Sequence, residues 1–237
     1  MNEDDARKQL AEVCRLTYWR GYVGGLEGNL SIRINESEIL STPASTCKGR
    51  VAPEHFIVTD TTGNQLRTPP HARGGRAKPS SELAMHIIAY KLRPDIRAIV
   101  HAHPIVATGF TVAGVPMQRC VLPEVVTTVG IVPTAPYATP STNEVPISIA
   151  ALLSKHDLIL LDHHGALSVG RDIWDAFYKI EMLENFAKTL LAAHQLGNVK
   201  ALKSSQVKKL LDIRGVYGVT NTLPVEKMLS SDCSEPD

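Results

Sequence analysis

The stretch Ile96-Arg97-Ala98-Ile99-Val100-His101-Ala102-His103-Pro104 lies near the middle of the 237-residue chain and joins a predicted β-strand to two histidines. Its first half is rich in β-branched residues, and the proline stops it, which is typical of a strand. Side chains alternate between the faces of a strand, so His101 and His103 point the same way. A divalent cation would satisfy the nitrogens of both rings, whereas the alternative is a polar strand end with two solvated histidines.

A third histidine follows another predicted strand. Leu158-Ile159-Leu160-Leu161 is a short apolar run typical of a buried strand, and it leads into His163-His164-Gly165. Glycine lets the backbone turn and bring the His164 ring inward. His163 would then face away from His164, as a supporting or packing residue. Three histidines with one open position form a catalytic zinc arrangement, so the sequence predicts a metal site.

The rest of the chain alternates between helical and extended patterns. Short loops between several strands favour antiparallel pairing, and no linker divides the chain, so we expect one α/β domain over residues 1–225. The polar residues 226–237 are expected to form a disordered tail. The expected helices span residues 3–20, 79–90, 105–112, 143–153, 172–196 and 205–214, and the other expected strands span 30–34, 38–43, 56–60 and 132–137.

Composition excludes several classes of function. Lys plus Arg number 25 and Asp plus Glu 24, so there is no basic excess of the kind that nucleic-acid binding requires. No apolar run approaches the roughly 20 residues that cross a bilayer. The acidic start Met1-Asn2-Glu3-Asp4-Asp5 has the wrong sign for a secretory or transit peptide, so we expect a cytoplasmic protein. The four cysteines form no CxxC pair, which argues against a thiolate zinc site.

Three short segments are candidate anion sites. Ser80 and Ser81 lie at the start of a predicted helix, where hydroxyls and free backbone amides gather. Gly28-Asn29 is either a second anion-binding loop or a tight turn before the strand 30–34. The loop 42–49 is a third candidate anion-binding loop. Glu82, in the first turn of the same helix as the serines, is either a general base beside the metal or a carboxylate favoured by the helix dipole.

Taken in order, these segments resemble the class II aldolase/adducin family of sugar-phosphate aldolases, epimerases and decarboxylases. The resemblance covers about residues 5–217. It implies a three-layer α/β/α fold around a mostly antiparallel sheet, a divalent metal and a homotetramer. It rests on Gly28-Asn29-Leu30-Ser31-Ile32-Arg33, Thr42-Pro43 with Lys48-Gly49, Pro79-Ser80-Ser81-Glu82 with His86, Val100-His101-Ala102-His103-Pro104, Pro136-Tyr137-Ala138-Thr139 and His163-His164-Gly165-Ala166.

The resemblance also implies roles for single residues. The metal, Zn²⁺ or another divalent cation such as Mn²⁺ or Co²⁺, would be held by His101, His103 and His164. Glu82 would be the catalytic acid/base. The expected reaction is retro-aldol cleavage of a small ketose phosphate through a metal-bound enediolate, to which Glu82 returns a proton. The implied phosphate-binding residues are Gly28, Asn29, Ser45, Ser80 and Ser81.

Other functions on the same scaffold stay open. A decarboxylase of a 3-oxo acid phosphate would generate the same kind of intermediate. A pentulose-phosphate 4-epimerase usually carries Asp where this chain has Glu82, and an adducin-like assembly module would have lost the ligands. Two departures from the aldolase pattern affect the expected substrate. Ala44-Ser45 stands where the aldolases typically carry Ser/Thr-Gly in a phosphate-binding loop, and Glu124 falls in the region where an aldolase has a catalytic tyrosine. Tyr217 could supply a phenol to a neighbouring subunit.

Overall fold

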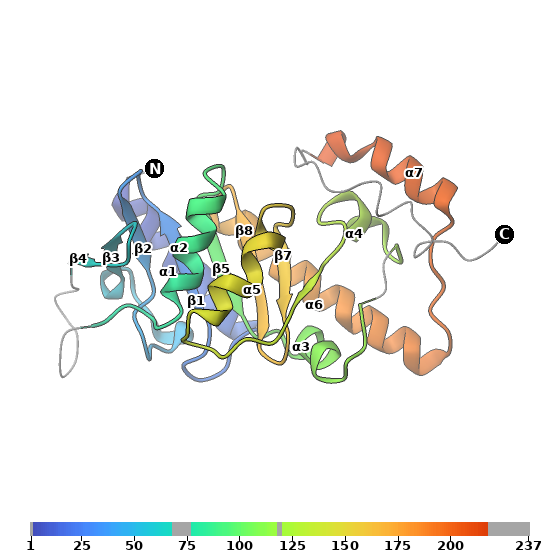
Figure 1. Cartoon of the computed structure of the whole chain (residues 1–237), viewed down its shortest axis with the longest axis horizontal. Coiled ribbons are helices and arrows are strands. Elements are labelled where there is room, and N and C mark those ends of the chain that lie inside the picture. The colour runs from blue at the N-terminus through green and yellow to red at the C-terminus, as the bar shows by residue number, and fades with distance from the viewer. Residues whose placement is uncertain (1, 68–76, 118–119, 218–237) are drawn as a thin grey trace.

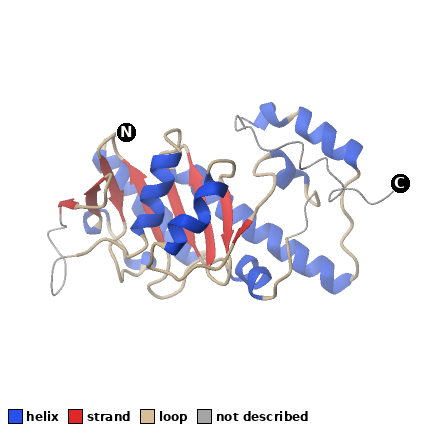
Figure 2. Ribbon diagram, in the orientation of Figure 1, coloured by secondary structure: helices blue, strands red, loops and turns tan. Residues whose placement is uncertain are grey.

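A computed structural model describes residues 2–67, 77–117 and 120–217, and these form a sheet with helices on both faces (Figures 1 and 2). The described strands follow the order β4-β3-β2-β1-β5-β8-β7-β6. All neighbouring pairs in this sheet are antiparallel except β6 and β7, which are parallel. The strands are β1 (Asn29–Arg33), β2 (Glu38–Ser41), β3 (Ile57–Asp60), β4 (Gln65–Arg67), β5 (Ala98–Ala102), β6 (Thr134–Ala135), β7 (Leu158–Leu161) and β8 (Gly165–Gly170).

Two helical layers cover the sheet. On one face lie α2 (Leu83–Leu92) and α5 (Glu144–Leu153), which pack through residues such as Ala89 and Ile149 on Ile99 and Ile159. The other face is covered by α1 (Glu3–Trp19), α3 (Ile105–Val112) and α6 (Ile173–Leu196). Because strand residues alternate between these two apolar cores, both faces are buried. The expected three-layer α/β/α fold around a mostly antiparallel sheet is confirmed.

A smaller helical unit lies beside the far end of α6 (Figure 1). Here α4 (Pro123–Thr127) packs against α7 (Ser204–Asp212) through a cluster that includes Val126, Ile131 and Val207. Three 3-10 helices complete the described elements: η1 (Lys48–Arg50), η2 (Pro53–His55) and η3 (Arg214–Tyr217). The expected tail at 226–237 lies outside the described residues. Among the described helices, none is both long and apolar enough to cross a membrane.

The pairing of the central strands positions the histidine-bearing segment. β5 lies between β1 and β8, and His101 is paired with Asn29 on one side and with Leu167 on the other. The close approach explains Gly28, whose φ is +68° and whose Cβ, if present, would lie 2.7 Å from the His101 carbonyl oxygen. The sheet therefore fixes the end of β5 from both edges.

Candidate metal centre

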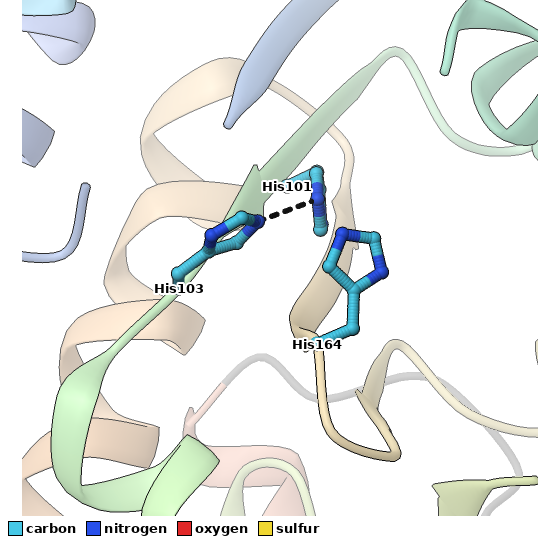
Figure 3. Close-up of side chains that lie close together, drawn as sticks. All are labelled: His101, His103 and His164. Atoms are coloured by element: carbon cyan, nitrogen blue, oxygen red, sulfur yellow. Dashed lines mark hydrogen bonds between the residues drawn. The ribbon is translucent and has the colours of Figure 1, made fainter. Parts of the chain in front are cut away.

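Three histidines from two neighbouring segments converge at one end of the sheet (Figure 3). His101 lies in β5, His103 directly follows it, and His164 ends the turn between β7 and β8. One nitrogen from each ring lies within 4.8 Å of the others, and the ring centroids are 4.8 to 5.0 Å apart. The structure thus brings together the three side chains that the sequence predicted as ligands.

Burial favours the neutral form of His101 and His103 in this cluster. His101 is fully buried, and its Nδ1 donates a hydrogen bond to the carbonyl oxygen of Ala166 at 2.9 Å, so its Nε2 keeps a lone pair. Burial lowers the pKa of His101 to about 4. Burial together with the neighbouring histidines lowers the pKa of His103 to about 3. Neutral imidazoles are the form that binds a metal.

Glu82 lies beside two histidines of this cluster. It is the N-cap residue of α2, one position before the helical turn in which the sequence placed it. Its Oε2 lies 3.5 Å from His101 Nε2, and its Oε1 lies 3.2 Å from His164 Nε2. Burial raises the pKa of Glu82, but the imidazoles of His164 and His101 and the amide of Asn29 lower it by more, so the net pKa lies below its usual range.

This donor set fits a divalent cation. Buried Oε1 of Glu82 has no hydrogen-bond partner among the residues that the structure describes, although it faces His164. A carboxylate oxygen and lone-pair nitrogens are all acceptors, and burying them together is costly unless a cation lies between them. Three imidazoles with one carboxylate suit zinc and other first-row divalent metals.

The three predicted anion loops lie next to one another at this end of the sheet. Pro43 forms a β-bridge with Pro79, and Ala44 donates its backbone N–H to the Lys78 carbonyl oxygen. The buried Lys48 ammonium donates to the carbonyl oxygens of Leu26 and Thr46, so it ties the 43–49 loop to the 24–28 loop. The ammonium of Lys48 therefore joins two loops of the protein.

The individual loop residues differ in what they offer a ligand. Ser45 is exposed and has a φ of +54°, a conformation that is unusual for a residue other than glycine. The hydroxyl of Ser80 accepts a hydrogen bond from the backbone N–H of Glu82, and the exposed Ser81 shares a hydrogen bond with Ser141. Asn29 uses its side chain within the protein, because its amide bonds to Glu82 and to His86.

Gly165 is required by close contact between the two histidine-bearing segments. A Cβ at this position would lie 2.5 Å from the Ala102 carbonyl oxygen and 2.7 Å from the His103 ring. We expect Gly165→Ala to lower the free energy of unfolding by about 1–3 kcal/mol, measured by urea denaturation, and to weaken metal binding. As a control, Gly109→Ala in α3 meets no atom within 4 Å and should be neutral or stabilising. Equal stability of the two variants would contradict this packing argument.

Buried His86 makes the stability depend on acidity. Burial lowers the pKa of His86 from 6.5 to about 4, whereas the unfolded chain keeps the ordinary value. Between pH 6.5 and 4 the unfolded state therefore binds more protons, and stability falls as the pH falls, by about 3 kcal/mol at pH 4. The free energy of unfolding of metal-free wild type and of His86→Gln would be measured by urea denaturation at pH 7, 5.5 and 4. Between pH 7 and pH 4, wild type should lose about 3 kcal/mol more than His86→Gln. Parallel pH curves would contradict it.

Comparison with known proteins agrees with this geometry. The sequence profile of the family described as "Class II Aldolase and Adducin N-terminal domain" matches residues 8–191. The chain belongs to the class II aldolase/adducin family. Among its class II aldolase relatives, a 3-oxo-tetronate 4-phosphate decarboxylase from Haemophilus influenzae is 32% identical over 87% of this chain and 97% of its own. An L-fuculose phosphate aldolase from Methanococcus maripaludis is 32% identical over 78% of this chain and 96% of its own.

Solved structures of class II aldolase relatives share the fold. YgbL from Klebsiella pneumoniae has a TM-score of 0.78 at 28% identity and covers 89% of this chain and 99% of its own. An L-fuculose 1-phosphate aldolase has a TM-score of 0.77 at 27% identity and covers 88% of this chain and 95% of its own. In sequence, the decarboxylase and the aldolase named above are about equally similar to this class II aldolase family member.

The structure also places the residues that the sequence left open. Glu124 is exposed on α4, beside α7, and is not part of the histidine cluster of this chain. Tyr217 is the last described residue, at the end of η3. Exposed His163 bonds to Asp162 and stays out of the cluster, as expected. Glu27, which the sequence did not single out, lies 3.7 Å from His103 Nδ1; only its place beside Gly28 could have indicated it.

Proposed function

We propose that the protein is a divalent-metal-dependent carbon–carbon lyase that cleaves a small ketose phosphate by a retro-aldol reaction. The convergence of His101, His103 and His164 on the free oxygen of Glu82 is the observation that supports this proposal. A cation held by the three histidines would supply a Lewis acid to the carbonyl oxygen of the substrate. Zinc as that cation, a homotetrameric assembly and a cytoplasmic location are parts of the same proposal.

Glu82 would move the proton that the reaction needs. Its lowered pKa keeps it ionised in the free protein, so it begins the cycle as a base. It takes the proton of the substrate hydroxyl whose carbon leaves as the aldehyde. The electron pair of the broken C–C bond then forms a C=C bond, and the π pair of the carbonyl moves to its oxygen, which gives an enediolate. Glu82 returns the proton to the enediolate carbon, so one carboxylate completes the cycle.

The neighbouring loops would bind the phosphate of the substrate. The exposed hydroxyls of Ser45 and Ser81 and the partly exposed Ser80 lie on loops that are adjacent to Glu82, and Gly28 lets the backbone come close. The names of both types of relative specify phosphorylated substrates, which supports this part of the proposal.

Decarboxylation of a 3-oxo acid phosphate is the second candidate. A relative of this activity is 32% identical and matches the chain over 97% of its own length. The chemistry also fits, because loss of CO₂ leaves one carbanion to protonate and requires no hydroxyl proton to be removed. Glu82, which is ionised in the free protein, would relay a proton from water to the carbon that CO₂ leaves.

A two-substrate assay tests the proposal. Zinc-loaded protein would be incubated with ketose 1-phosphates, and dihydroxyacetone phosphate would be followed by coupled NADH oxidation. A parallel assay would follow CO₂ release from 3-oxo acid phosphates. Triose phosphate that appears with wild type and is lost in Glu82→Gln supports the aldolase. CO₂ without triose phosphate replaces it with the decarboxylase, and no product from either class of substrate contradicts both.

A further inference from the structure

A buried array of hydrogen-bonded polar side chains runs from Glu82 into the interior between β1 and α2. Asn29 Nδ2 lies 2.7 Å from Glu82 Oε2, and His86 Nε2 lies 2.6 Å from Asn29 Oδ1. His86 Nδ1 lies 2.7 Å from the Ser31 hydroxyl, which lies 2.8 Å from the Tyr90 hydroxyl. Asn29, Ser31, His86 and Tyr90 are each at most 5% exposed. Bulk water therefore has little access to these four residues.

The chemistry of these groups fixes the direction of every hydrogen bond. An ionised carboxylate only accepts, so the Asn29 amide must present its NH₂ to Glu82 and its oxygen to His86. His86 Nε2 must then carry the ring proton. Burial holds His86 neutral, so its Nδ1 accepts from the Ser31 hydroxyl, and Ser31 in turn accepts from the Tyr90 hydroxyl. All donors point toward Glu82.

We infer that His86 is a positioning residue for Glu82, because its Nε2–H holds the Asn29 amide in the orientation that donates to Oε2. Without that proton, Asn29 could rotate by a half-turn and present its oxygen to the carboxylate, which would be repulsive. With it, the two oxygens of Glu82 differ: Oε2 is held by Asn29, and Oε1 faces His164. This inference rests on the proposed acid/base role of Glu82.

The end of this polar array that lies farthest from Glu82 is also held in place. The guanidinium of Arg33 lies 4.7 Å from the centre of the Tyr90 ring, on the same face of β1 as Asn29 and Ser31. His86 and Tyr90 are four residues apart on α2, so they lie on one side of the helix. One strand face and one helix face therefore carry the complete array, and no loop contributes to it.

Paired substitutions of His86 test the inference. His86→Gln keeps an N–H near the Nε2 position, whereas His86→Met has similar size and no donor. We expect His86→Met to lower kcat by roughly tenfold or more with KM and bound metal nearly unchanged, and His86→Gln to recover most of the loss. Met85→Leu, a buried neighbour on α2 outside the array, controls for packing. Equal kcat in His86→Met and wild type would overturn the inference.

A double-mutant cycle separates this inference from the proposed function. If His86 acts through Glu82, adding His86→Met to Glu82→Gln lowers kcat no further. Additive losses would mean that His86 acts elsewhere and would overturn the inference while leaving the role of Glu82 intact. Full activity of Glu82→Gln alone would instead overturn the proposed function.

A measurement on the unmodified active site needs no turnover. In zinc-loaded wild type with ¹⁵N-labelled histidine rings, NMR should show His86 as the neutral Nε2–H tautomer at pH 7. The His86→Gln spectrum identifies its signals among those of the nine histidines. An Nδ1–H tautomer or a charged ring would overturn the inference, even if no substrate had been found.

Discussion

Replacing His164 with alanine is expected to abolish stoichiometric metal binding and, with it, turnover. His164 is one of three ring nitrogens within 4.8 Å of one another, and a two-histidine remnant leaves the cation exposed to water. Loss of an outer-shell partner of a metal ligand typically lowers affinity by about 10- to 100-fold, so loss of a ligand itself should exceed that range. Bound metal after dialysis, measured by elemental analysis, and titration calorimetry would report the change.

The adjacent histidine provides the matched control. His163 has the same chemistry, one position away, but it is exposed and bonds to Asp162. His163→Ala should keep one metal per chain. Full metal occupancy in His164→Ala, or equal losses in the two variants, would show that the cation is bound elsewhere.

Glu82→Gln should separate metal binding from catalysis. The three histidines remain, so bound metal should stay close to one per chain, whereas kcat should fall by about 10²- to 10⁴-fold because the proton carrier is lost. The amide keeps the size of the carboxylate and can still bond to Asn29. Steady-state kinetics on the substrate identified by the two-substrate assay, with metal content measured on the same sample, gives both quantities.

Glu27→Gln is the comparison for this variant. Glu27 is the other carboxylate near the described cluster, 3.7 Å from His103 Nδ1, but its side chain is 53% exposed. We expect a much smaller loss of kcat from this change. If Glu27→Gln lost turnover and Glu82→Gln kept it, the acid/base role would belong to Glu27.

The sequence predicts the histidine-bearing segments well because each carries a strong local signal. Alternation along a strand places His101 and His103 on one face, and a glycine after His164 indicates the turn that the structure contains. The family and the layered fold followed from the ordered motifs and are confirmed. The ligand and acid/base roles of these residues stay predictions, although the structure brings the side chains together.

Other features of the fold have no local signal. Strand β8 was not predicted, because Gly165–Gly170 is buried on both faces and consists of small and apolar residues without alternation. The contact of Asn29 with Glu82 and His86 depends on pairing β1 with β5 and packing α2 on β1. Only three-dimensional packing shows that the polar groups of Asn29 and Lys48 form hydrogen bonds within the protein.

The position of β5 between β1 and β8 has a consequence for how the chain would bind the proposed cation. The contact of Ser168 with Val100 joins residues 68 positions apart, and pairings of such long range form slowly during folding. His101 and His103 leave the ribosome well before His164 does, so a growing chain offers the cation only two of its three nitrogens. At the proposed metal site, binding of the cation would therefore be a late event that requires the completed sheet, and the bound ion would stabilise only molecules that have reached that state.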